Sequence, residues 1–123
     1  MASEALEQRI QQELPHLPRD KVGDLAQIVR RLAEALQPEQ IFVFGSQARG
    51  EAQPESDVDL LVVVPHSDLP PHRRDQEAYR AMGRRRISVD VLVMTRFEFD
   101  QRSRAASSLP ATVLREGRVL YAA

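Results

Sequence analysis

Apolar residues recur at helical spacing through the first third of the chain. Leucine and isoleucine stand four residues apart over residues 1–14, which predicts a helix that ends at the prolines of positions 15 and 18. Between Asp20 and Pro38, apolar residues return every three or four positions. We therefore expect a second amphipathic helix, whose first turn the Asp20 carboxylate can cap.

From residue 41 onward the apolar residues form short continuous runs, which are typical of buried strands. Four such runs cover residues 41–44, 58–64, 87–94 and 118–121. Helical patterns lie between the later runs, from residue 71 or 72 to about 84 and over residues 109–116. Thr95 followed by Glu98 matches a capping box, which predicts the start of another short helix.

This alternation of helices and strands predicts an α/β (α+β) fold, in which helices flank a mixed β-sheet. A chain of 123 residues is of ordinary size for a single domain. We expect residues 1–18 to form a helical extension and residues 20–121 to form the core of that domain. With 17 basic and 18 acidic residues and a net charge of −1, the chain as a whole has no attraction for nucleic acid, which argues against direct nucleic-acid binding.

The chain has no segment near the ~20 apolar residues that span a bilayer. Its acidic N-terminus lacks the layout of a signal peptide. It also has no cysteine, which excludes disulfides and thiolate metal sites. We therefore expect a cytoplasmic protein without membrane contact.

Two aspartates at the start of the second run need a chemical explanation. Asp57 and Asp59 are two residues apart, so their carboxylates project from the same face of a strand. Burying a carboxylate is costly unless it is paired or binds a metal. In the third run, Asp90 lies on the face opposite to the β-branched residues and would join the other two if the strands are adjacent. Three such carboxylates favour Mg²⁺, as a two-ion site, with Mn²⁺ as the alternative.

Other roles for these aspartates remain open. Asp57 and Asp59 could be solvated carboxylates at a strand end, and Asp90 could be an edge charge that opposes aggregation. Neither role alone explains why all three stand at matching positions of two strands.

Gly45 and Ser46, directly after the first strand, predict a phosphate-binding turn. Glycine permits close approach to the backbone, and Ser46 adds a hydroxyl and an N–H group. A helix starting near Gln47 would point its positive end at the same place. A simple turn is the alternative. Arg49 could bind phosphate or pair with Glu51.

The spacing of these residues resembles that of one superfamily. The segment GSQARGEAQPESDVD contains Gly-Ser, ten intervening residues and Asp-x-Asp. This is similar to the signature of the DNA polymerase β-like nucleotidyltransferases and, among them, of the minimal nucleotidyltransferase (MNT) proteins and MntA-type antitoxins. SVDVLV resembles the third-aspartate strand of that family, and REGRVLY resembles its usual C-terminus. The resemblance extends from about Asp20 to Tyr121.

The resemblance implies a metal-dependent nucleotidyltransferase domain. Its catalytic and metal-binding residues would be Asp57, Asp59 and Asp90, and its nucleotide-binding residues Gly45, Ser46 and Arg49. It implies ATP as the donor and AMP as the transferred group. The implied acceptor is a tyrosine of a HEPN-domain toxin, which this protein would neutralise as the antitoxin of a toxin–antitoxin pair.

Two other functions fit the residues. The chain could be a non-catalytic antitoxin that masks its partner by contact, or a free-standing nucleotidyltransferase that acts on a small-molecule hydroxyl. Transferases for antibiotics or RNA ordinarily have an added acceptor domain, and a chain of this length leaves no room for one. This expectation favours a protein acceptor.

Overall fold

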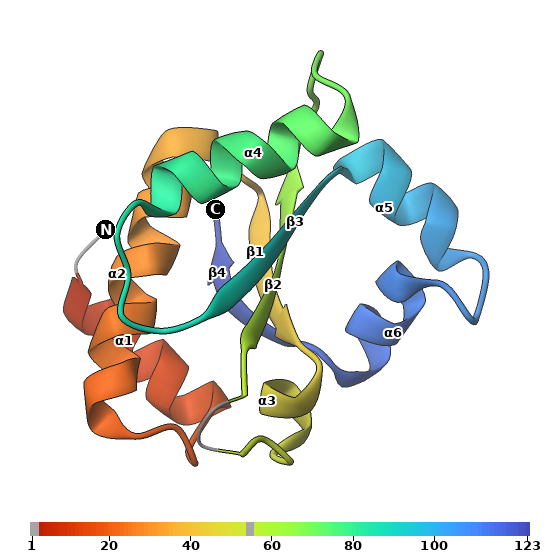
Figure 1. Ribbon diagram of the computed structural model, residues 1–123. Helices are drawn as coiled ribbons and strands as arrows, with labels where there is room; N and C mark the ends of the chain where they lie inside the picture. Colours follow the sequence, from red (N-terminus) through yellow and green to blue (C-terminus); the bar gives the residue numbers. More distant parts are fainter. Residues whose placement is uncertain (1–2, 54–55) are drawn as a thin grey trace.

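A mixed β-sheet lies at the centre of the structure, a computed structural model that describes residues 3–53 and 56–123. Within these ranges four strands pair in the order β3-β2-β1-β4 (Figure 1). The strands are β1 Gln40–Phe44, β2 Val58–Val64, β3 Val89–Thr95 and β4 Arg118–Ala122. β1 runs antiparallel to both β2 and β4, whereas β2 and β3 are parallel. The predicted α+β architecture with a mixed sheet is confirmed.

Helices α1 Ser3–Glu13, α2 Arg19–Leu36 and α4 Pro71–Met82 cover one face of the sheet. Alternate strand residues, such as Leu60 and Val91, meet the apolar faces of these helices in a large buried cluster. The predicted N-terminal extension, α1, belongs to this cluster through its buried leucines and isoleucine. Burial of apolar surface, at roughly 25 cal/mol per Å², is what holds these helices against the sheet.

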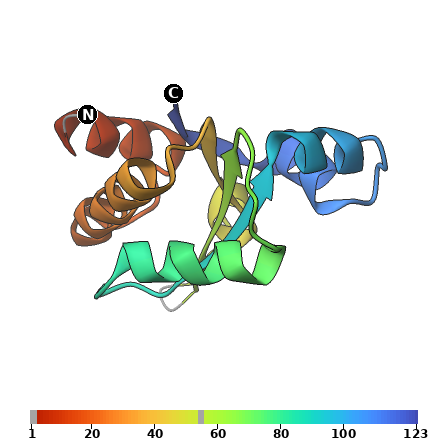
Figure 2. The same ribbon diagram turned by 90° about the horizontal axis from the view of Figure 1, so that it is seen from above.

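Helices α5 Arg96–Ser103 and α6 Leu109–Glu116 lie on the other side of the sheet (Figure 2). Phe42 of β1 stacks on Phe99 of α5, with ring centroids 5.7 Å apart, at the centre of a smaller buried cluster. This face is covered incompletely, because Asp90 and Leu92 of β3 stay exposed. A single-turn helix, α3 Ser46–Arg49, follows β1 at the end of the sheet where β2 begins.

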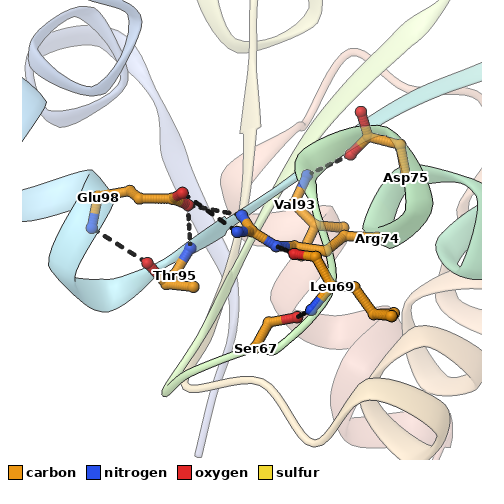
Figure 3. A network of polar contacts seen from close by, with 7 residues as sticks. All are labelled: Ser67, Leu69, Arg74, Asp75, Val93, Thr95 and Glu98. Carbon is orange, nitrogen blue, oxygen red and sulfur yellow. Dashed lines mark hydrogen bonds and ion pairs between the residues drawn. The ribbon is translucent and has the colours of Figure 1, made fainter.

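Polar contacts join α4, β3 and α5 (Figure 3). The guanidinium of Arg74 donates to both carboxylate oxygens of Glu98, at 2.6 and 3.2 Å. The Glu98 carboxylate also accepts the N–H of Thr95, and the Thr95 hydroxyl accepts the N–H of Glu98. The capping box predicted at the start of α5 is therefore confirmed.

Side chains of α4 close the outer edge of β3, which is the end strand of the sheet. Asp75 accepts the N–H of Val93 at 2.9 Å, and the hydroxyl of Tyr79 accepts the N–H of Val91 at 3.2 Å. Free strand edges pair readily with other chains. These contacts occupy two of the donors that such pairing would use.

The start of α2 differs from the prediction. The helix begins at Arg19 with Pro18 at its N-cap position, and Asp20 makes no capping hydrogen bond, so the predicted Asp20 cap is wrong. Proline is suited to this position because its φ is fixed and it has no N–H to satisfy. The Asp20 carboxylate, one residue inside the helix, still interacts favourably with the helix dipole. None of the described helices is long and apolar enough to cross a membrane.

Candidate active site

The predicted site residues gather at one end of the sheet, where β1 ends and where β2 and β3 begin. Gly45 follows β1, and Ser46 is the first residue of α3. Asp57 immediately precedes β2, and Asp59 is the second residue of that strand. Because α3 contacts both β1 and β2, the glycine–serine turn and the aspartates share one region.

Asp59 and Asp90 are direct neighbours across the parallel pair β2–β3. Adjacent strands lie about 4.8 Å apart, and paired residues point to the same face. Val58 and Val89, one residue earlier in each strand, are buried against the layer of α2 and α4. The two aspartates therefore point to the opposite, partly open face. The strand adjacency that Asp90 requires is present.

Gly45 lies against the carboxylate of Asp59. A β-carbon built on Gly45 would collide with Oδ2 of Asp59. Gly45 also has φ 73° and ψ −153°, a backbone conformation that is essentially restricted to glycine. Glycine is therefore needed at this position for two independent reasons, its backbone conformation and the space that Asp59 takes up.

The charges at this end of the sheet are unbalanced. Burial raises the pKa of Asp59, and the carboxylates of Asp90 and Asp57 raise it further, while Arg49 acts in the opposite direction. The Asp59 carboxylate thus lies in an environment that disfavours its own negative charge. A bound cation would reverse that preference.

The three aspartates do not form a preformed metal cluster. Across residues 3–53 and 56–123, no three or more His, Cys, Asp and Glu side chains are arranged to hold a metal ion. The structure pairs Asp59 with Asp90 across β2 and β3 and places Asp57 directly before β2, and the charges of Asp90 and Asp57 add to the raised pKa of Asp59. Their coordination of one ion stays a prediction.

The side chains around the glycine turn differ in what they contact. Ser46 is half-buried, its carbonyl accepts the N–H of Glu51, and its hydroxyl has no hydrogen-bond partner among the described residues. Arg49 pairs with Glu51 at 2.6 Å, and both side chains are largely exposed. The Glu51 pairing foreseen as one role of Arg49 is therefore present, and its phosphate role stays a prediction.

Sequence reasoning missed Gln47, which is almost fully buried beside the site. Its Oε1 lies 3.0 Å from Nε2 of His16, in the turn between α1 and α2, and its Nε2 donates to the carbonyl of Ser56. Ser56 directly precedes Asp57, so Gln47 ties the glycine turn to the aspartate segment. No local pattern could have identified it, because both contacts come from other parts of the chain.

Comparisons with known proteins show similarity to one domain family and to solved structures. The model of a nucleotidyltransferase domain family matches residues 25–117. A Sulfolobus solfataricus protein, provisionally assigned as a nucleotidyltransferase, has a similar structure with a TM-score of 0.59 at 21% identity, over 98% of this chain and 86% of that chain. A chain from a toxin–antitoxin structure with AMP-PNP matches with a TM-score of 0.49 at 21% identity, over 79% of this chain and 72% of that chain. No curated protein sequence matches the chain.

Proposed function

Because the chain belongs to the nucleotidyltransferase domain family, we propose that it transfers a nucleoside monophosphate from a triphosphate to a hydroxyl acceptor. The observation that supports this reaction is the pairing of Asp59 with Asp90 across β2 and β3. Asp57 lies two residues before Asp59, so three carboxylates are available beside the Gly45–Ser46 turn.

Asp57, Asp59 and Asp90 are the proposed ligands of Mg²⁺, with Mn²⁺ as the alternative. Carboxylate oxygens are the donors that these hard cations prefer. A cation there would also offset the burial and the neighbouring charges that raise the pKa of Asp59. When bound, divalent metal would neutralise phosphate charge and polarise the phosphorus that is attacked.

The protein's own residues would position the reactants. The backbone of Gly45 would contact the triphosphate, and so would the hydroxyl of Ser46, which has no hydrogen-bond partner among the described residues. The acceptor oxygen would form a bond to the α-phosphorus, and the bond from that phosphorus to the pyrophosphate oxygen would break. Asp90, which is exposed, would take the proton of the acceptor hydroxyl. Arg49 would bind phosphate by exchanging its exposed contact with Glu51.

The finer proposal names the substrate and the partner. We infer ATP as the donor and a tyrosine of a HEPN-domain toxin as the acceptor, with this protein as the antitoxin. Support for this comes from the resemblance of the GSQARGEAQPESDVD segment to the minimal nucleotidyltransferases. The acceptor would bind beside Asp90, and Asp90 is exposed, which is compatible with a protein as the substrate.

The test uses ATP that is labelled at the α-phosphate and determines which molecule receives the label. The purified chain with Mg²⁺ is incubated with the candidate toxin, and the labelled residue is identified by mass spectrometry. We expect label on a tyrosine of the toxin, and at least about a hundredfold slower transfer by the D57N/D59N variant. A D68N/D100N variant removes two exposed aspartates that follow the far ends of β2 and β3; it is the matched control and should transfer normally.

Two outcomes would replace this proposal. If D57N/D59N still neutralises the toxin as well as the wild type does, the protein acts by masking rather than by transfer. If the chain alone labels a small-molecule hydroxyl and leaves the toxin unlabelled, the acceptor is not a protein.

A further inference from the structure

A hollow of about 660 Å³ lies between α2 and the loop that joins α4 to β3. Figure 1 shows this loop passing beside α2 before the chain enters β3. Four arginines line the hollow, Arg31 from α2 and Arg84, Arg85 and Arg86 from the loop. We refer to it as the arginine groove. It belongs to the layer of α2 and α4, whereas Asp59 and Asp90 point to the opposite face of the sheet.

The loop that contributes three of these arginines is held in place. At the end of α4, Gly83 adopts φ 61°, so the chain reverses in a conformation that favours glycine. The guanidinium of Arg31 then donates to the carbonyls of Met82 and Arg84, at 2.9 and 3.1 Å. One α2 side chain thereby fixes the turn, and the groove has a defined wall.

Among the described residues, the four arginines of the groove are balanced by little acidic charge. Arg85 lies over the ring of Tyr79, at 5.6 Å from its centroid, and donates to the carbonyl of Gly83. Arg84 and Arg86 form no ion pair with any described residue, and Asp24 is the one acid in the lining. Four guanidinium groups around one hollow repel each other, and an anion bound between them would relieve that repulsion.

We propose that the arginine groove is a second phosphate-binding site, separate from the site at the aspartates. The planar guanidinium group presents paired N–H donors that match phosphate oxygens. The lining offers little to a protein partner, because its one large apolar side chain, Ile28, is already buried in the core. The residues that dominate protein interfaces are tryptophan, tyrosine and arginine, and the described lining of the groove has no aromatic residue to accompany its arginines. The phosphates could belong to a free oligophosphate or to a nucleic-acid strand.

The test is an NMR titration of isotope-labelled protein with inorganic triphosphate in the presence of EDTA. EDTA removes divalent metal, so binding that depends on metal at the aspartates is suppressed. We expect saturable shifts at the amides of residues 83–88 and at the guanidinium of Arg31. An R84Q/R86Q variant should bind about tenfold more weakly. An R73Q/R118Q variant, which removes two exposed arginines outside the groove, should change affinity less than about twofold.

A second arm distinguishes the two sources of phosphate. A short single-stranded RNA of mixed sequence that binds more tightly than triphosphate, with an affinity that falls steeply with salt, identifies a nucleic-acid strand as the ligand. Tighter binding of free triphosphate identifies a small oligophosphate. The proposal is overturned if triphosphate shifts only Gly45 and Ser46, if both double variants weaken binding equally, or if polyglutamate binds as tightly as triphosphate.

Discussion

Gly45 shows how one residue without a side chain can define a site. Its backbone conformation is nearly forbidden to other residues, and the Asp59 carboxylate fills the space that a β-carbon would need. Gly50, four residues after Ser46, also has φ 73°, but nothing lies within 4 Å of the position of its β-carbon. Gly50 has ψ 20°, in the left-handed helical region, so it is a control for a positive φ with no side chain packed against it.

We expect the G45A variant to lose about 2–3 kcal/mol of unfolding free energy and most of its transferase activity. The stability loss comes from a strained backbone combined with a displaced Asp59, and the activity loss comes from the displacement. The G50A variant should lose only about 1 kcal/mol and keep its activity. Urea denaturation and the labelled-ATP assay measure the two effects. Equal activity of the two variants would show that contact between Gly45 and Asp59 has no role in the reaction.

At the scale of helices and strands, the hydrophobic pattern predicted the bounds of several elements well, because the apolar residues that form the pattern are the ones the fold buries. The segment 58–64 was predicted at its observed bounds, since all its apolar residues are buried. The helix 109–116 was also predicted at its bounds, between a serine cap and Gly117. The β3 strand begins at Val89, two residues later than its apolar pattern, because pairing with β2 decides where a strand starts. The Asp20 cap failed because Pro18 already occupied that position.

Contacts between distant elements have no such pattern in the sequence, and the pair Arg74–Glu98 is one of them. Arg74 lies in α4 and Glu98 in α5, and the side chain of Arg74 is only 9% exposed. Removing Arg74 leaves the Glu98 carboxylate, whose side chain is 35% exposed, with only water and, among the described residues, the N–H of Thr95 as partners. The exposed pair Arg49–Glu51 has the same 2.6 Å separation and provides a comparison at a different degree of burial.

We expect the R74M variant to lose about 1–2 kcal/mol of unfolding free energy, because water still reaches the Glu98 carboxylate that is left behind. The R49M variant should hardly change it, because water screens an exposed pair. The hydrogen bond from Arg74 lowers the pKa of Glu98. Stability from this pair is therefore present above the usual pKa of glutamate and is lost as the pH falls through the lowered one. Urea denaturation at neutral and acid pH tests both statements. Similar losses in R74M and R49M would mean that burial does not set the strength of these pairs.

For the molecule as a whole, the site and the groove differ in how far the sequence predicts them. The sequence predicts a common site for the aspartates from their spacing on the condition that the two strands are adjacent, as β2 and β3 are. The groove combines Arg31 of α2 with Arg84–Arg86, and only the packing of α2 beside the α4–β3 loop brings them together. In the sequence, three consecutive arginines after a helix look like an ordinary solvated helix end. Gln47 was missed for the same reason, because its burial depends on contacts from elsewhere in the chain.

The acidic end of the sheet should make the stability of the whole protein depend on pH and on divalent metal. Burial, followed by the charges of Asp90 and Asp57, raises the pKa of Asp59, so the folded state binds this proton more tightly than the unfolded state does. Stability from protonated Asp59 is therefore present at acid pH and is lost as the pH rises through the raised pKa. Above the raised pKa the ionised Asp59 carboxylate destabilises the fold, and there the D59N variant should unfold at a higher urea concentration than the wild type.

Divalent metal should reverse this order of stability. An ion that binds only the folded protein stabilises it by about 2.7 kcal/mol when its concentration is a hundred times its Kd. We expect MgCl₂ to raise the melting temperatures of the wild type and of the D68N/D100N control, and to leave those of D59N and D57N/D59N unchanged. Calorimetric melting with and without EDTA measures the shift. If MgCl₂ raises the melting temperature of D57N/D59N as much as that of the wild type, the ion binds elsewhere and these aspartates are not its ligands. If D59N is less stable than the wild type in EDTA, the Asp59 carboxylate stabilises the fold, and its proposed repulsion by Asp57 and Asp90 is wrong.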